Sequence, residues 1–148
     1  MADLPSTLKA ISGKLTASRG DSELLYGRLQ PQAIPLEEAV LGAIMIDKDG
    51  FPSIIEILRK ESFYLDKNQT IFDVMSDLFG KSQPIDLLTV HESLKKTGKL
   101  EGVGGIGYLM DLTNKVGSAA NIEFHARIIA QKFIQRELIR VSTQIIHD

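Results

Sequence analysis

A glycine-rich run in the second half of the chain has the spacing of a nucleotide-binding loop. Gly102, Gly104 and Gly107 fit the pattern G-x-G-x-x-G, in which glycines let the backbone approach the pyrophosphate of a dinucleotide. That chemistry needs a strand leading into the first glycine, a helix leaving the last one, and an acidic residue about 20 residues further on. The elements around the run therefore decide whether the pattern binds a nucleotide.

Those elements do not match the requirement. Residues 87–99 lead into the run with a helical period instead of the alternation of a strand. Glu123 lies near the expected distance for the acid, but it falls early in a predicted long helix. The sequence therefore predicts a tight loop between helices, where glycine supplies a positive φ and room for close backbone approach. A nucleotide-dependent enzyme is the less favoured hypothesis.

Other chemistry has no support in the residue types. The chain has no cysteine, which excludes disulfides, thiolate catalysis and cysteine metal sites. His91, His125 and His147 are far apart and lack metal-ligand spacing. Glu37 and Glu38 are interpreted as solvated carboxylates that favour a helix N-terminus, not as an acid–base pair. The sequence thus predicts no catalytic residue, no cofactor site and no metal site.

Composition indicates an ordinary globular protein. The chain has 148 residues, of which 43% are hydrophobic and 24% are charged, and its net charge is −2; one domain is the simplest organisation. The slight negative charge argues against a domain whose main task is to grip phosphate backbones. The sequence shows neither a secretory signal nor an apolar run of the ~20 residues that a membrane span needs, so we expect a cytoplasmic protein without a membrane partner.

The periodicity of apolar residues predicts an all-α fold in three parts. Residues 1–29 are polar and are expected to form a flexible leader. Residues 30–117 are expected to form a compact multi-helix head. One helix of this head, over about 67–79, should turn its apolar stripe inward as far as Phe79 and be followed by Gly80 at the position after its end. Asp86 should cap the next helix.

The remaining residues, 118–148, are predicted to form one long helix. Ser118 or Asn121 should cap it, and its length exceeds the ~11–12 residues of an average helix. Its C-terminal half is expected to pack against a partner helix. Because no helix stop signal precedes Asp148, we expect the chain to be a fragment of a larger protein. The stripe of the long helix comprises Ile122, Ile129, Phe133, Ile134, Leu138, Val141 and Ile145.

A line of basic residues follows the same helix. Lys132, Arg136 and Arg140 are spaced four apart. The favoured interpretation is a solvated face, tempered by Glu137. The alternative is a contact to DNA or to an acidic partner, which would make the chain a stand-alone helical nucleic-acid-binding domain.

A series of short motifs follows one another along the chain in a specific order and spacing. They are Pro31-Gln32, Glu38-Ala39-Val40-Leu41-Gly42, Asp47, Phe63-Tyr64, Ile71-Phe72, Pro84-Ile85-Asp86-Leu87, Gly104-Gly105-Ile106-Gly107-Tyr108-Leu109, Ala119-Ala120-Asn121-Ile122 and Arg136-Glu137-Leu138-Ile139. Together these motifs resemble the N-terminal domain of bacterial replicative DNA helicases, the DnaB family. The resemblance covers residues about 28–148, so the leader is not part of it.

The resemblance implies an assembly domain without catalysis of its own. In that family a helical head precedes a helical hairpin, hairpins pair between subunits, and six chains form a ring whose collar engages primase and influences loading. A separate RecA-like motor with ATP and Mg unwinds and translocates on DNA. The resemblance implies that this chain holds only the first arm of the hairpin and lacks that motor, so we expect neither helicase activity nor a cofactor in it.

The same resemblance implies candidate partner contacts. Tyr108, Ile139 and Ile145 are the candidate contacts to primase or to a neighbouring subunit, and Arg136 and Arg140 are further candidates for partner binding. A helicase loader is a further expected partner of the parent protein. For Tyr108, Ile139 and Ile145, simple core packing stays open as the alternative.

Overall fold

The computed structural model describes residues 30–116 and 121–147. The predicted flexible leader, residues 1–29, and Ser118, one of the two expected caps, lie outside the described residues. Contacts divide the chain into Met1–Gln30 and Pro31–Asp148, and the fold given below is that of the second unit.

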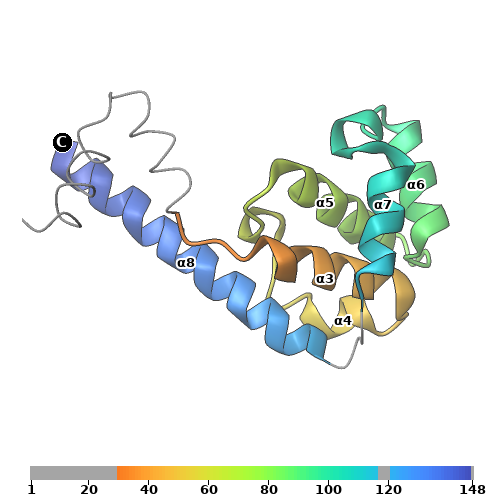
Figure 1. Ribbon diagram of the computed structural model, residues 1–148, viewed down its shortest axis with the longest axis horizontal. Helices are drawn as coiled ribbons and strands as arrows, with labels where there is room; N and C mark the ends of the chain where they lie inside the picture. Colours follow the sequence, from red (N-terminus) through yellow and green to blue (C-terminus); the bar gives the residue numbers. More distant parts are fainter. Residues whose placement is uncertain (1–29, 117–120, 148) are drawn as a thin grey trace, which may run out of the picture. The chain divides into compact units, whose positions relative to one another are not determined.

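Across its described residues the chain is helical and contains no strand, which confirms the predicted all-α class. Figure 1 shows the helices in sequence colours, with α3 lying between α8 on one side and α5 and α7 on the other. The elements are α3 (Ile34–Ile46), α4 (Gly50–Ile54), the 3-10 turn η1 (Lys60–Ser62), α5 (Asp66–Gly80), α6 (Leu87–Lys96), the 3-10 turn η2 (Glu101–Val103), α7 (Gly105–Asn114) and α8 (Ile122–His147).

Helix α3 is the centre of the core. Every residue from Val40 to Met45 is buried, because α4, α5, α7 and α8 all pack against this one helix. Gly42 makes the tightest of these contacts possible. A Cβ atom at this position would lie 2.1 Å from the carbonyl oxygen of Leu112 in α7, so only glycine allows the two backbones to approach this closely.

Helix α5 supplies much of the remaining core and ends differently from the prediction. Phe79 was expected inward but is 39% exposed. Gly80 was expected beyond the helix but is its last residue. The left-handed residue at this end is Ser82, with φ of 57°, and the amide of Gln83 donates to the carbonyl of Leu78 at 2.9 Å. This is the hydrogen-bond pattern that commonly ends a helix, with serine in the place usually taken by glycine.

Helix α6 begins as predicted. The amide of Thr89 donates to the Asp86 carboxylate at 2.9 Å, and the amide of Asp86 donates to the Thr89 hydroxyl at 2.9 Å. The two residues therefore satisfy two backbone amides that the start of a helix leaves without partners.

The glycine run forms the predicted loop between helices. Gly104 and Gly105 have φ of 105° and 72°, and they join η2 to the start of α7. No strand leads into the run, because a helix and a 3-10 turn precede it. The glycine pattern therefore forms a turn between η2 and α7 and lacks the sheet edge that a dinucleotide site requires.

Candidate docking surface

Helix α8 has one half packed on the head and one half without buried residues. Over its 26 residues, only Ile122, Ala126 and Ile129 are buried. Their spacing of four and three residues places them on one side of the helix, facing α3 and α4. Figure 1 shows α8 continuing past the other helices of the head after this contact.

Arg136 holds α8 at the point where the buried contacts end. Its guanidinium donates to the carbonyl oxygen of Pro31 at 2.8 Å and to that of Ser62 at 2.9 Å. The same group lies 5.3 Å from the ring centroid of Tyr64 and 5.8 Å from that of Phe133. Burial lowers the pKa of Arg136, although an arginine remains charged in proteins. This side chain therefore joins the long helix to the segment before α3 and to η1.

Four apolar residues of α8 form what we call the outer stripe: Ile134, Leu138, Val141 and Ile145. Their side chains are 58%, 62%, 42% and 70% exposed, respectively. Their spacing of four, three and four residues is that of the a and d positions of a coiled coil. Leu138 lies about 200° around the helix from Arg136, so the stripe faces away from the side of α8 that contacts the head.

The charged groups beside the outer stripe neutralise each other on the helix itself. Arg140 donates to the Glu137 carboxylate at 2.9 Å and to the Gln144 side chain at 3.2 Å. The hydrogen bond from Arg140 lowers the pKa of Glu137, and the Glu137 carboxylate raises the pKa of Arg140. Such exposed pairs add little stability. A partner helix would therefore meet an apolar stripe with little net charge along this edge.

The predicted partner residues fall into two places. Arg136, Ile139, Arg140 and Ile145 share α8, where Ile145 belongs to the outer stripe and Ile139 is half-buried. Tyr108 lies on α7 and is half-buried, and its hydroxyl donates to the Asn68 side chain at 2.6 Å. Burial, and next the nearby Glu38 carboxylate, raise the pKa of Tyr108 to about 12. Their contacts to a partner stay predictions.

The interpretation of Glu37 as a solvated carboxylate is wrong. Its side chain is only 1% exposed and accepts hydrogen bonds from the amide of Tyr64 at 2.7 Å and from the Asn68 side chain at 3.0 Å. Because Asn68 also accepts from Tyr108, one polar network joins α3, α5 and α7. A sequence signal was available, since the nearly unbroken apolar run from Ala39 to Ile46 indicates a helix buried on all sides. Glu38 also differs, because it is paired with Lys115.

The residues that the structure describes include no group of three or more histidine, aspartate or glutamate side chains that could hold a metal ion. Within the same residues, no helix is both long and apolar enough to cross a membrane. The described surface includes the exposed apolar stripe of α8, which is suited to binding another apolar surface.

Comparisons with known proteins agree with the fold and with the sequence motifs. Residues 29–131 match the family model described as the DnaB-like helicase N terminal domain. The chain is 48% identical over 120 residues to the replicative DNA helicase DnaB of Rhodothermus marinus. This aligned region covers 81% of this chain and 13% of that protein. The chain is 44% identical over 127 residues to the replicative DNA helicase DnaC of Bacillus subtilis (strain 168), covering 86% of this chain and 28% of that protein. The chain thus spans well under a third of the curated relatives it matches.

Solved structures give the same result. The crystal structure of the N-terminal domain of DnaB helicase from Mycobacterium tuberculosis matches with a TM-score of 0.77 and 35% identity, over 80% of this chain and 86% of that one. A structure of a DnaB-like replicative helicase and its interactions with primase matches with a TM-score of 0.66 and 30% identity, over 78% of this chain and 27% of that one. The resemblance noted in the sequence is confirmed: the chain belongs to the DnaB-like helicase N-terminal domain family.

Proposed function

We propose that this chain serves as the oligomerisation and primase-docking domain of a cytoplasmic replicative DNA helicase. The observation that carries the proposal is the outer stripe, four exposed apolar residues in coiled-coil spacing on a helix that is fastened to a folded head. The relatives named above support the assignment to a replicative helicase. Unwinding, ATP, Mg and contact with DNA belong, in this proposal, to parts of the parent protein outside this chain.

Self-association through the outer stripe follows from its chemistry. Each exposed aliphatic side chain that a partner helix removes from water contributes on the order of 1 kcal/mol, and the four act together along one seam. Because Glu137 and Arg140 already neutralise each other beside the stripe, the association should depend only weakly on salt. A helix of a second subunit is the partner that this apolar, weakly charged seam fits.

Primase is the second partner in the proposal. One solved relative is described with its interactions with primase, which supports the same role for this chain. Tyr108, Ile139 and Ile145 are the proposed contacts, on α7 and α8, with Arg136 and Arg140 beside the latter two. A helicase loader is proposed as a partner of the parent protein.

The test replaces one residue of the outer stripe by a charge. Leu138→Asp should weaken self-association or primase binding about tenfold or more, which corresponds to 1.4 kcal/mol. The matched control is Leu88→Asp on α6, because Leu88 is 69% exposed and lies outside α8. Sedimentation at several concentrations and a primase pull-down give the two readouts, and thermal melting checks that both variants fold. If Leu138→Asp and Leu88→Asp behave alike in both assays, the proposal fails.

The alternative, a stand-alone nucleic-acid-binding domain, loses its main support in the structure. The Arg136 guanidinium already donates hydrogen bonds to two backbone carbonyls, and Arg140 is paired with Glu137. Both arginines therefore already have partners within the chain. Of the basic line, only the side chain of Lys132 makes no hydrogen bond or ion pair with another of the described residues. Tight binding of labelled single-stranded DNA, with a steep loss of affinity as salt rises, would restore this alternative.

A further inference from the structure

The buried carboxylate of Glu37 begins a series of hydrogen bonds that ends at Tyr108. Its Oε2 atom accepts from the backbone amide of Tyr64 at 2.7 Å, and its Oε1 atom accepts from Nδ2 of Asn68 at 3.0 Å. The side-chain oxygen of Asn68, Oδ1, in turn lies 2.6 Å from the Tyr108 hydroxyl. Glu37 and Asn68 are 1% and 0% exposed, so neighbouring groups, and not bulk water, decide how they pair.

Each hydrogen bond of this series has a fixed direction. An ionised carboxylate has acceptors and no donor, whereas an amide side chain carries its donors on nitrogen and its acceptor on oxygen. Asn68 must therefore turn Nδ2 toward Glu37, which leaves Oδ1 facing Tyr108. Because Oδ1 has no proton, the Tyr108 hydroxyl supplies the proton of their 2.6 Å contact. The hydroxyl proton of Tyr108 thus points into the head.

A positive charge compensates the buried carboxylate. The Arg136 guanidinium lies over the ring of Tyr64, the residue whose amide donates to Glu37, and it also donates to the carbonyl of Ser62. Burial lowers the pKa of Arg136, and the negative charge of Glu37 opposes that shift. The carboxylate therefore has both hydrogen-bond donors and a nearby opposite charge, as buried charges usually do.

What remains for a partner at Tyr108 is the acceptor side of its oxygen. Tyr108 is half-buried, and no other residue in the described part of the chain hydrogen-bonds to its hydroxyl. A phenol has a single proton and can also accept, so once the proton is used inward the oxygen can only accept from outside. The Lys67 ammonium group lies 3.8 Å from the ring centroid, which holds the phenol in place from a second side.

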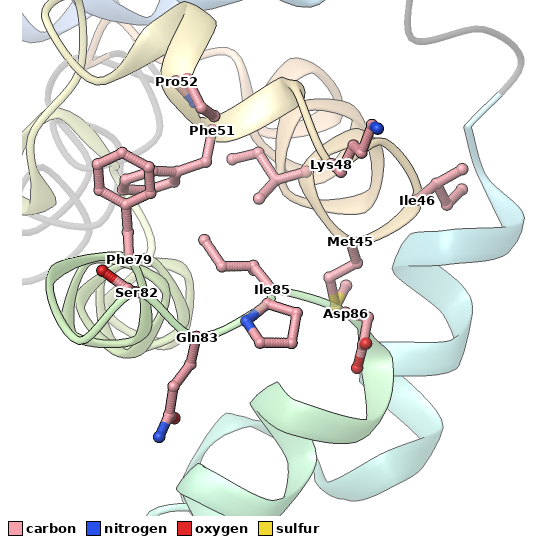
Figure 2. A pocket seen from close by; sticks show the side chains of 12 residues that line it. Met45, Ile46, Lys48, Phe51, Pro52, Phe79, Ser82, Gln83, Ile85 and Asp86 are labelled. Carbon is pink, nitrogen blue, oxygen red and sulfur yellow. The ribbon is translucent and has the colours of Figure 1, made fainter.

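This series is separate from the pocket shown in Figure 2. That pocket has a volume of about 850 Å³ and lies where the ends of α3 and α5 meet α4 and the loop before α6, with Phe79 and Ile85 among its walls. Glu37, Asn68 and Tyr108 are not among its lining residues. Substitutions within the series should therefore leave the pocket unchanged, which provides a local check that a variant keeps its fold.

We propose that Glu37 is a positioning residue that makes Tyr108 a hydrogen-bond acceptor toward its partner, so that the partner group facing Tyr108 must be an N–H or O–H donor. The inference rests on the proposed function, in which Tyr108 contacts primase, and it deepens that function by naming the chemistry of the matching group. A carbonyl or carboxylate oxygen of primase at this place would meet a second acceptor, which disfavours such a pairing.

One substitution of nearly the same shape should reverse the whole series. In Glu37→Gln the amide of Tyr64 still donates, so the new side chain keeps its oxygen there and turns its nitrogen toward Asn68. Asn68 then flips, its Nδ2 donates to the Tyr108 oxygen, and the Tyr108 proton points outward. Infrared spectroscopy follows this change, because the C–O stretching band of a phenol differs between donating and accepting hydrogen bonds. Tyr108→Phe identifies the band by removing it.

Primase binding is the second readout. Glu37→Gln and Tyr108→Phe should each weaken it about threefold to tenfold, the effect of one hydrogen bond. Adding Asn68→Asp to Glu37→Gln should restore both the band and the affinity, because a carboxylate at position 68 again accepts from Tyr108. The matched control is Glu38→Gln, which removes the same charge from a carboxylate paired with Lys115 and should change neither readout. Thermal melting and the amide chemical shifts of the pocket residues check the fold of each variant.

The infrared result decides the direction of the hydrogen bonds without primase. The parent chain should show the band of a donating phenol, and an accepting phenol there would overturn the proposal whether or not Glu37→Gln folds. A folded Glu37→Gln variant that keeps the donor band would also overturn it.

The binding result decides whether a partner needs the acceptor. A Tyr108→Phe variant that binds primase like the parent would remove Tyr108 from the contact and refute the donor requirement, while self-association, tested with Leu138→Asp, would stand. A double variant that regains the band but not the affinity would refute that requirement as well. If the parent chain does not bind primase at all, the primase part of the proposed function fails and the donor requirement fails with it.

Discussion

Arg136 donates a hydrogen bond to the backbone carbonyl oxygen of Pro31 at 2.8 Å, across 105 residues of sequence. The contact joins the middle of the last helix to the segment that leads into α3. A carbonyl at the start of the fold is therefore satisfied by a side chain near its end. The guanidinium group therefore adds a polar anchor to the apolar contacts that Ile122, Ala126 and Ile129 make with the head.

The first prediction concerns this contact. Arg136→Gln should lower the free energy of unfolding by roughly 1–3 kcal/mol, because two hydrogen bonds from a charged donor are lost and two carbonyls lose their partner. Urea denaturation followed by circular dichroism measures the change. Arg140→Gln is the control, and it should leave the free energy of unfolding close to that of the parent, since Arg140 pairs only with exposed groups of its own helix. Equal effects of the two substitutions would contradict the assigned role of Arg136.

The buried carboxylate gives the second prediction. Glu37→Ala should destabilise the fold by about 2–5 kcal/mol, because the amide of Tyr64 and the side chain of Asn68 would remain buried without an acceptor. Glu38→Ala is the control. Its partner Lys115 is 56% exposed, so this loss should be ~1 kcal/mol or less. The same denaturation measurement compares the two, and a Glu37→Ala variant as stable as Glu38→Ala would show that the network contributes little.

A pair of glycines gives the third prediction. Gly42→Ala should lower stability by roughly 1–3 kcal/mol or more, since the new Cβ would lie 2.1 Å from the Leu112 carbonyl oxygen and force α3 and α7 apart. Gly80→Ala should have the opposite sign, with a gain of about 0.5–1 kcal/mol, because Gly80 is helical and nothing lies within 4 Å of its added Cβ. Melting temperatures should move in opposite directions. A neutral Gly42→Ala would mean that the two helices can separate at no cost.

The fourth prediction is a pH dependence. The pKa of Tyr108 is raised from 10.0 to about 12, first by burial and then by the Glu38 carboxylate. A raised pKa in the folded state means that the folded chain holds this proton more tightly than the unfolded chain. The corresponding stability is fully present below pH 10 and is lost as the pH rises from 10 to about 12.

Ultraviolet titration of tyrosinate absorbance tests this prediction. The intact chain should show a late transition near pH 12 that is missing in Tyr108→Phe. The decline of stability above pH 10 should likewise be shallower in that variant. A Tyr108→Phe titration curve with the same late transition as the parent would assign the high pKa to another tyrosine.

Local signals in the sequence were sufficient for most of the helices and for the Asp86 cap, but not for the end of α5, where Ser82 takes the left-handed conformation that was expected at Gly80. The Asp86 cap, the glycine loop before α7 and the length of α8 depend on neighbouring residues, so pattern and propensity predict them. The close approach at Gly42 has a local signal too, because a glycine inside a helix indicates close packing by another helix. These features are set within a few residues along the chain.

Long-range contacts were harder to predict for a physical reason. Whether Glu37 is solvated depends on donors supplied 27 and 31 residues later, and the role of Arg136 depends on carbonyls 74 and 105 residues earlier. A helical period indicates which side of α8 is basic but not which of its cations face the head. The outer stripe was visible in the sequence as apolar periodicity. Which apolar residues of α8 are buried against the head and which are exposed could be decided only from the packing of the head.

Among the described residues, Arg136 is the last side chain of α8 that hydrogen-bonds outside its own helix. The residues that follow it, to His147, extend about 16 Å at the rise of an α-helix. A tilt of only ~10° about this anchor would displace the far end sideways by roughly 3 Å. A small rearrangement around a single guanidinium is thus amplified along the helix into a change of spacing and crossing angle against any helix that lies alongside.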